Sequence, residues 1–145
     1  MHDMPGCKYT HLDRKYSIED LAAFHGHLGP YIVLGYRIGR YAREYFCSDA
    51  FEMSAIIHCS GTPPQSCVVD GVQIGSGCTM GKRNIDLKAS DSVSCEFTAG
   101  MKKMVIRPKP IEFPQRSEDH FRRIEQLAVD MYWADDTDLF EVSST

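Results

Sequence analysis

A turn of six residues near the N-terminus, His25-Gly26-His27-Leu28-Gly29-Pro30, constrains the fold most because it breaks a helical pattern. Before it, Ser17 is typical of a helix N-cap with an acid three residues on, which predicts a short helix ending near Phe24. After it, Pro30 suits the first turn of a second helix. Apolar and aromatic residues recur there at helical spacing down to about Phe46: Leu34, Ile38, Tyr41, Ala42 and Tyr45.

Two glycines, Gly35 and Gly39, lie four residues apart in the second predicted helix. Residues at this spacing share one helix face. Their small size would let another backbone approach that face closely, and tight packing is the preferred interpretation.

The rest of the chain reads as short strands followed by a long helix. We expect strands over residues 51–58, 84–89, 92–98 and 103–107, the last three as a meander, and an edge strand over 139–142. Residues 67–74 fit a helix or a strand, and a helix is favoured because Ser66 can cap it. A last helix is expected over 117–133. The prediction is an α+β fold, with the N-terminal helices and a C-terminal helix packed on a mixed or antiparallel sheet, in one domain over 1–145 with an arm at 1–16.

Composition excludes several functional classes. Hydrophobic residues make up 43% of the 145 residues and charged residues 25%, as in ordinary soluble domains. The net charge of −4 and the lack of a long basic run argue against a nucleic-acid surface. No apolar run is long enough to span a bilayer, and no secretory signal is recognisable, so we expect a cytoplasmic protein without a membrane partner. The six cysteines form no CxxC pair and are expected to be reduced.

The first candidate site is the His25-Gly26-His27 segment. In a turn, two imidazoles two residues apart can point to one side, and histidine is the commonest metal ligand in proteins. Taken alone, the pair is weak evidence for a metal site, and exposed or merely hydrogen-bonded imidazoles are the preferred interpretation.

The second candidate site runs from Cys67 to Asn84 and contains a glycine-rich loop over residues 75–81. Successive backbone N–H groups in such a loop can form an anion-binding nest, with Lys82 and Arg83 adding positive charge. The loop matches neither GxxxxGK[ST] nor GxGxxG, so a nucleotide site is disfavoured. The predicted substrate-binding or anion-binding residues are Gly77, Thr79, Gly81 and Asn84.

Three interpretations of Cys67 and Cys78 remain open. As thiolates they can join His25 or His27 at a zinc, nickel or iron ion. Alternatively, Cys78 is a catalytic nucleophile or a redox thiol, whose pKa is lowered by Lys82, Arg83 and nearby backbone N–H groups. Both can also be small buried apolar side chains.

Two polar residues of the same segment are expected to support the site. Asp70 and Gln73 share a face of the predicted helix, where they can orient an imidazole or cap the glycine loop. Metal-bound histidines usually have such a hydrogen-bond partner.

Taken together, the two segments resemble the FmdE family of formylmethanofuran dehydrogenase components over about residues 17–110. The matching residues are Phe24-His25-Gly26-His27 with Pro30, then Gly35-Tyr36-Arg37 with Gly39, then Cys67, Asp70-Gly71-Val72-Gln73, Gly77-Cys78-Thr79, Gly81-Lys82 and Asn84. The resemblance implies an α+β core, commonly an intertwined homodimer, and a metal or active site formed by His25, His27, Cys67 and Cys78. It also implies a link to methanogenic one-carbon metabolism, beside a molybdenum or tungsten formylmethanofuran dehydrogenase.

The chain departs from this family at two places. Many relatives carry a cysteine at the position of Gly29, and many have a C-terminal zinc finger that is missing here. Cys59, in the Cys59–Pro64 stretch, is a candidate to replace the missing thiol.

Three functions follow as hypotheses. The first is a metal-binding accessory component of one-carbon metabolism, with zinc as the expected ion and nickel or iron as alternatives. The second is an enzyme for an anionic or pterin-like small molecule, with Cys78 as nucleophile and Lys82 holding the anion. The third is a structural dimeric protein without catalysis.

Overall fold

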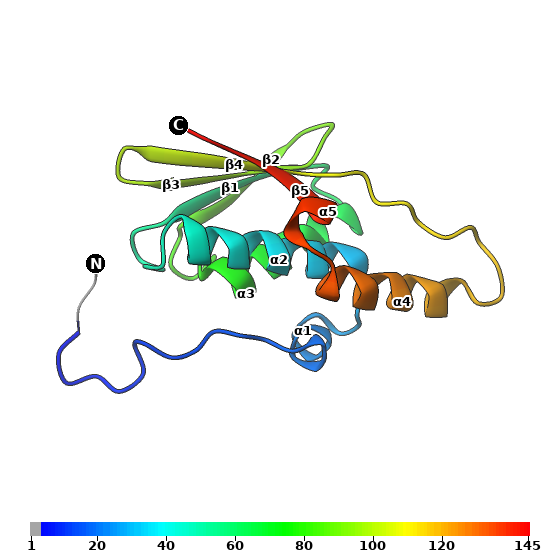
Figure 1. The fold of residues 1–145 in the computed structure, drawn as a ribbon, viewed down its shortest axis with the longest axis horizontal. Helices are drawn as coiled ribbons and strands as arrows, with labels where there is room; N and C mark the ends of the chain where they lie inside the picture. The colour runs from blue at the N-terminus through cyan, green and yellow to red at the C-terminus, as the bar shows by residue number, and fades with distance from the viewer. Residues whose placement is uncertain (1–3) are drawn as a thin grey trace.

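The computed structural model describes residues 4–145, so the first three residues of the predicted arm lie outside the described residues. Residues 4–16 form no helix or strand and run along the molecule as an extended arm (Figure 1). The helices are α1 (Ile18–His25), α2 (Pro30–Tyr45), the short 3₁₀ helix η1 (Gln65–Cys67), α3 (Val68–Ser76), α4 (His120–Trp133) and α5 (Asp136–Leu139). The strands are β1 (Ser54–Cys59), β2 (Ile85–Ala89), β3 (Ser94–Ala99), β4 (Lys102–Pro108) and β5 (Phe140–Ser144).

The strands form one mixed sheet in the order β2-β1-β3-β4-β5. Strands β1 and β2 are parallel, and every other neighbouring pair is antiparallel. The α+β prediction with a mixed sheet is therefore confirmed. The predicted meander is wrong at its first strand, because β2 pairs with β1 and not with β3. A parallel neighbour needs a crossover connection, and α3 supplies it.

The helices cover one face of the sheet (Figure 1). On β1, Ala55, Ile57 and Cys59 are buried beneath them, while the alternate residues are exposed or half-buried. This alternation matches the two-residue period of a strand with one covered face. The largest fully buried side chains, Tyr36 and Phe97, come from α2 and β3. Tyr36 packs between Tyr16 of the arm and Tyr132 of α4.

Glycines hold α2 and α3 together at very short range. A Cβ on Gly35 would overlap the carbonyl oxygen of Val68, and one on Gly71 would overlap that of Ile32. Gly39 and Gly75 repeat the arrangement one turn along. Any larger side chain would push the two backbones apart, so the predicted close approach to the second helix is made by α3.

The turn between α1 and α2 follows from its residues. Ser17 and Asp20 form a capping box at the start of α1, as the sequence predicts. Gly26 ends α1 with φ of 99°, a left-handed conformation that favours glycine. Pro30 then begins α2. This turn brings His27 beside the end of α1.

Helix α4 is fixed to α2 mainly through its C-terminal end. The buried guanidinium of Arg37 donates to the carbonyl oxygens of Met131 and Tyr132 at 2.8 and 2.9 Å, and to a carboxylate oxygen of Asp136 at 2.9 Å. The N-terminal half of α4 extends beyond the sheet, and a long connection from β4 leads to it (Figure 1).

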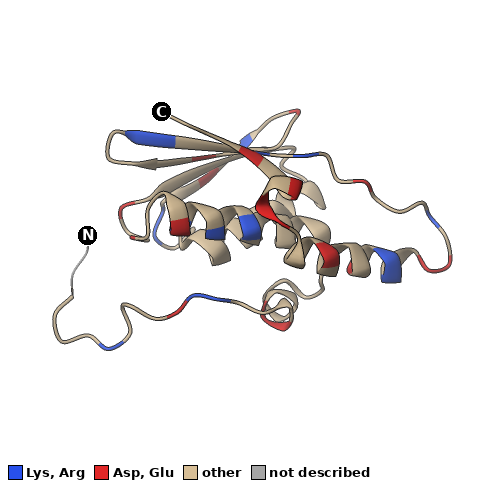
Figure 2. Cartoon of the chain, in the orientation of Figure 1, with Lys and Arg blue, Asp and Glu red and all other residues tan. Residues whose placement is uncertain are grey.

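Acidic and basic residues are interspersed along the chain (Figure 2). Within residues 4–145, no helix is both long and apolar enough to cross a membrane.

Candidate functional site

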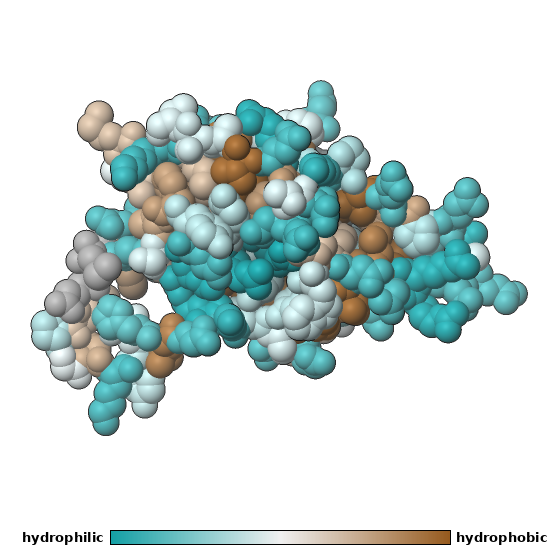
Figure 3. Space-filling view, viewed as in Figure 1, coloured by the Kyte–Doolittle hydropathy of each residue, from teal (hydrophilic) through white to brown (hydrophobic). Residues whose placement is uncertain are grey.

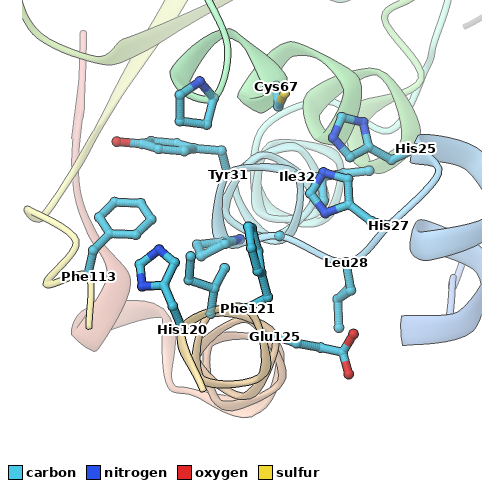
Figure 4. A pocket seen from close by; sticks show the side chains of 14 residues that line it. His25, His27, Leu28, Tyr31, Ile32, Cys67, Phe113, His120, Phe121 and Glu125 are labelled. Carbon is cyan, nitrogen blue, oxygen red and sulfur yellow. The ribbon is translucent and has the colours of Figure 1, made fainter. Parts of the chain in front are cut away.

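A pocket of about 620 Å³ opens where the α1–α2 turn meets α4. His25, His27 and Cys67 lie on one side of it, and Phe113 and His120 lie on the other (Figure 4). The start of α4 adds further apolar side chains. In the space-filling view the outer surface over α4 is mainly hydrophilic, with apolar areas beside it (Figure 3). This volume is typical of small-molecule sites, which are concave and mostly apolar.

His25 is held by a carboxylate from α3. Its Nδ1 lies 2.7 Å from Oδ2 of Asp70, and the imidazole is only 11% exposed. Because an ionised carboxylate can only accept, Nδ1 carries the proton and donates it. In the neutral imidazole, Nε2 is then left as an acceptor, ready for a metal ion or a proton.

His27 lies next to His25, with the two ring centroids 4.9 Å apart and the planes tilted by 46°. A Cβ on Gly29 would lie 3.1 Å from Cε1 of His27. The His27 ring therefore occupies the space in front of residue 29.

Cys67 ends η1 at the start of α3 and lines the same pocket. Burial raises the pKa of its thiol, and the negative charge of Asp70 raises it further. The protonated thiol is therefore favoured over the thiolate, and the sulfur loses its proton when it binds a metal cation.

The donor chemistry of this wall suits a transition metal, but the donors do not converge. Two imidazoles and a thiol are ligands that zinc, nickel and iron accept. Among residues 4–145, no group of three or more His, Cys, Asp or Glu side chains is placed to hold a metal ion. A further donor or a change of side-chain rotamer is required to complete such a site.

Cys78 lies away from this pocket. It follows α3, whose nine residues separate it from Cys67 by about 14 Å at the rise of an α-helix. The thiol is fully buried and donates to the carbonyl oxygen of Met53 at 3.4 Å. Burial raises its pKa more than Lys82 lowers it, so the predicted lowering of this pKa is wrong.

The glycine-rich loop binds its own polar groups. The amide of Thr79 donates to Oδ1 of Asn84, and the amide of Met80 donates to Oε1 of Gln73. Nζ of Lys82 donates to the Thr79 hydroxyl at 2.9 Å and lies 5.7 Å from the centre of the Phe51 ring. Donors that an anion would need are thus already bonded within the chain.

The other predicted residues of the loop, and Cys59, do not line the pocket. Gly77 ends α3 with φ of 84°, and Gly81 lies in open space. Cys59 is fully buried in the core and does not line the pocket. The structure therefore brings His25, His27, Cys67 and Asp70 together and places the glycine-rich loop elsewhere.

Sequence reasoning missed the far wall of the pocket. Phe113, His120, Phe121 and Glu125 belong to the connection before α4 and to its first turns. His120 is isolated in the sequence and carries no motif, and the aromatic residues resemble an ordinary apolar stripe. Only the packing of α4 against the start of α2 brings them opposite His25.

Comparisons with known proteins place these features in context. A family model described as "FmdE, Molybdenum formylmethanofuran dehydrogenase operon" matches residues 24–141. A probable S-adenosyl-L-methionine-binding protein of Archaeoglobus fulgidus is 33% identical over 69 residues, which cover 43% of this chain and 18% of that protein. The aligned part thus spans less than a fifth of that relative.

Proposed function

This chain belongs to the FmdE family and is a formylmethanofuran dehydrogenase-related protein, and we propose from that premise that its pocket binds a divalent transition metal, with zinc as the expected ion. The hydrogen bond between His25 and Asp70 carries this proposal, because it fixes the imidazole tautomer and leaves Nε2 as an acceptor. His27 and Cys67 are the other proposed ligands. Cys78 is left out because it is fully buried at the far end of α3.

The metal-binding role requires a small change in the pocket. His27 and Cys67 have to turn toward Nε2 of His25, or a bound molecule has to supply a donor. A site with three protein ligands and an open position is the arrangement found in catalytic zinc centres. The proposed role is therefore a metal centre with room beside it for a small molecule.

Zinc binding to protein purified without a histidine tag tests the proposal. Elemental analysis and competition with a chelator should detect about one zinc per chain. His25→Ala and His27→Ala should each weaken zinc binding at least tenfold, because each removes one ligand. His11→Ala, which alters an exposed histidine of the arm, is the matched control and should bind zinc as the unmodified protein does. Absence of zinc, nickel and iron after purification, with no later uptake, would refute the role.

We also propose that the protein acts as a homodimer and as an accessory to a molybdenum or tungsten formylmethanofuran dehydrogenase. The FmdE family match supports the second part. The large apolar side chain of Trp133, which is left exposed at the end of α4, supports the first. Sedimentation should give twice the chain mass of 16.4 kDa; a mass of one chain at micromolar concentration contradicts the dimer.

S-adenosyl-L-methionine is a second candidate ligand, suggested by the name of the Archaeoglobus relative. The aromatic lining of the pocket can stack on the adenine ring of this ligand. Glu125 offers a carboxylate to the cationic group of the ligand, which the aromatic rings also favour. Calorimetric titration with S-adenosyl-L-methionine tests it, and no heat at millimolar ligand excludes it.

A further inference from the structure

Aromatic rings from separate segments face the pocket and are arranged in pairs (Figure 4). Rings placed on several sides of a cavity can contact both faces of a flat ligand. The centroid distances are 5.8 Å for Tyr31 and Phe113, 5.6 Å for His120 and Phe121, and 4.9 Å for His25 and His27.

The charge of the lining restricts what the pocket accepts. Glu125 lines it, and none of its lining residues in the described part of the chain is a lysine or arginine. In the metal-free pocket, an anion would lose water of hydration without gaining a fixed cation from the protein, which is costly in an apolar site. The lining therefore favours a ligand without negative charge.

One polar atom in this wall has no partner within the structure. Nδ1 of His120 is buried and makes no hydrogen bond with any described residue. A buried nitrogen of this kind usually has a partner, and a ligand in the pocket can supply one once the imidazole turns toward it. The adjacent Phe121 is 78% exposed although it faces the pocket, and a ligand would cover it.

We propose that this pocket binds a planar aromatic ring system that has no negative charge and carries at least one hydrogen-bonding group. The ring lies among Tyr31, Phe113 and Phe121, and its polar group reaches the imidazoles. The volume of about 620 Å³ accommodates a ligand of two or three fused rings. This inference rests on the proposed function only in taking the same pocket as the ligand site, and it adds the class of ligand.

Three matched probes test the class: 2-naphthamide, its saturated analogue decahydronaphthalene-2-carboxamide, and 2-naphthoate. Binding is followed by NMR shifts of the pocket residues in the full chain, after any metal has been removed with a chelator. We expect 2-naphthamide to bind at least tenfold more tightly than either of the others, because one analogue lacks the aromatic ring and the other is an anion. Equal binding of the saturated amide, stronger binding of the naphthoate, or no shift with 2-naphthamide overturns the inference.

Substitutions locate the binding. Phe121→Leu keeps an apolar side chain but removes the ring, and should weaken 2-naphthamide binding at least fivefold. Phe24→Leu, which changes a similarly exposed phenylalanine outside the pocket, is the control and should leave binding unchanged. His120→Phe keeps a ring without its nitrogens and should weaken binding about threefold, as expected for one neutral hydrogen bond. Unchanged binding in both Phe121→Leu and His120→Phe overturns the inference.

Metal removal separates this inference from the proposed function. Protein stripped with a chelator should still bind 2-naphthamide, and Phe121→Leu should still bind zinc. If no zinc binds but 2-naphthamide does, the metal role fails and the aromatic site stands. If zinc binds but 2-naphthamide does not, the aromatic site fails and the metal role stands.

Discussion

At the scale of single residues, the carboxylate of Asp70 links the two candidate segments. It lies on α3 and reaches His25 at the end of α1 across 45 positions in the sequence. Its own side chain remains 38% exposed, so the contact contributes little to stability but fixes the direction of the imidazole. Asp70 therefore matters mainly because it orients the His25 imidazole as a proposed metal ligand.

Asp70→Asn tests this orienting role. The amide keeps the size of the side chain but loses the charge that holds Nδ1 protonated, so zinc affinity should fall about tenfold or more. The free energy of unfolding should change by less than about 1 kcal/mol. Chelator competition and urea unfolding measure the two effects, with Asp91→Asn at an exposed turn as control. A large loss of stability with unchanged zinc affinity would make Asp70 structural.

The buried thiol of Cys95 makes the free energy of unfolding decrease at alkaline pH. Burial raises the pKa of its thiol above the ordinary 9.0, with Cys59 nearby adding to the effect. Above pH 9 the unfolded chain loses this proton while the folded chain keeps it. Stability contributed by the neutral thiol is thus fully present below pH 9 and is lost as the pH rises.

We expect Cys95→Ala to remove part of this pH dependence. Between pH 9 and 10 the free energy of unfolding of the wild type should fall by about 1 kcal/mol more than that of the variant, for the one proton involved. Urea unfolding under reducing conditions at several pH values measures both slopes. Cys7→Ala, at an exposed cysteine of the arm, should leave the slope unchanged. Equal slopes for Cys95→Ala and wild type would contradict the assignment.

At the scale of elements, the contact between α2 and α3 depends on glycine. Four glycines, two from each helix, allow one backbone to touch the other. Their spacing on α2 is visible in the sequence, but the partner helix is not, because any helix with small residues at similar spacing satisfies the same pattern. This contact places the start of α3, with Cys67 and Asp70, beside the α1–α2 turn.

Gly35→Ala should disrupt this contact. Its Cβ would overlap the carbonyl oxygen of Val68, which belongs to the backbone and cannot turn aside. The free energy of unfolding should fall by about 3 kcal/mol, at the upper end of overpacking effects. Gly81→Ala, with open space around its Cβ, should change it by less than about 0.5 kcal/mol. Urea unfolding compares the two, and equal values would contradict the close packing.

At the scale of the whole molecule, α4 completes the pocket while Arg37 anchors only its far end. The guanidinium binds two terminal carbonyl groups of α4 and Asp136 beyond it, which lie 94 to 99 positions away. A cation at the C-terminus of a helix also matches the helix dipole. The position of the aromatic wall therefore depends on a contact outside the pocket.

Arg37→Met should loosen α4. Losing charge-assisted hydrogen bonds to buried carbonyl groups should lower the free energy of unfolding by about 2–3 kcal/mol. Hydrogen exchange of α4 amides should speed up more than that of α3. Arg122→Met, which removes a 78%-exposed guanidinium paired only with Asp119 in the described structure, should have almost no effect. Unchanged exchange in α4 would contradict the anchoring role.

The sequence by itself determined the local elements of this protein. Helix caps, the proline after the His25–Gly29 turn and the two-residue alternation of strands depend on neighbours along the chain. They located α1, α2, α3, α4 and most strands, and they marked His25, His27 and Cys67 as candidates.

Only the tertiary structure decided which segments meet. It placed β2 beside β1, buried Cys78 about one helix length from Cys67, and brought His120 and Phe121 opposite His25. Pairing and burial depend on side-chain packing between distant segments, which local periodicity does not encode. The two-segment centre of the sequence interpretation thus becomes a pocket built from the α1–α2 turn, the start of α3 and the start of α4.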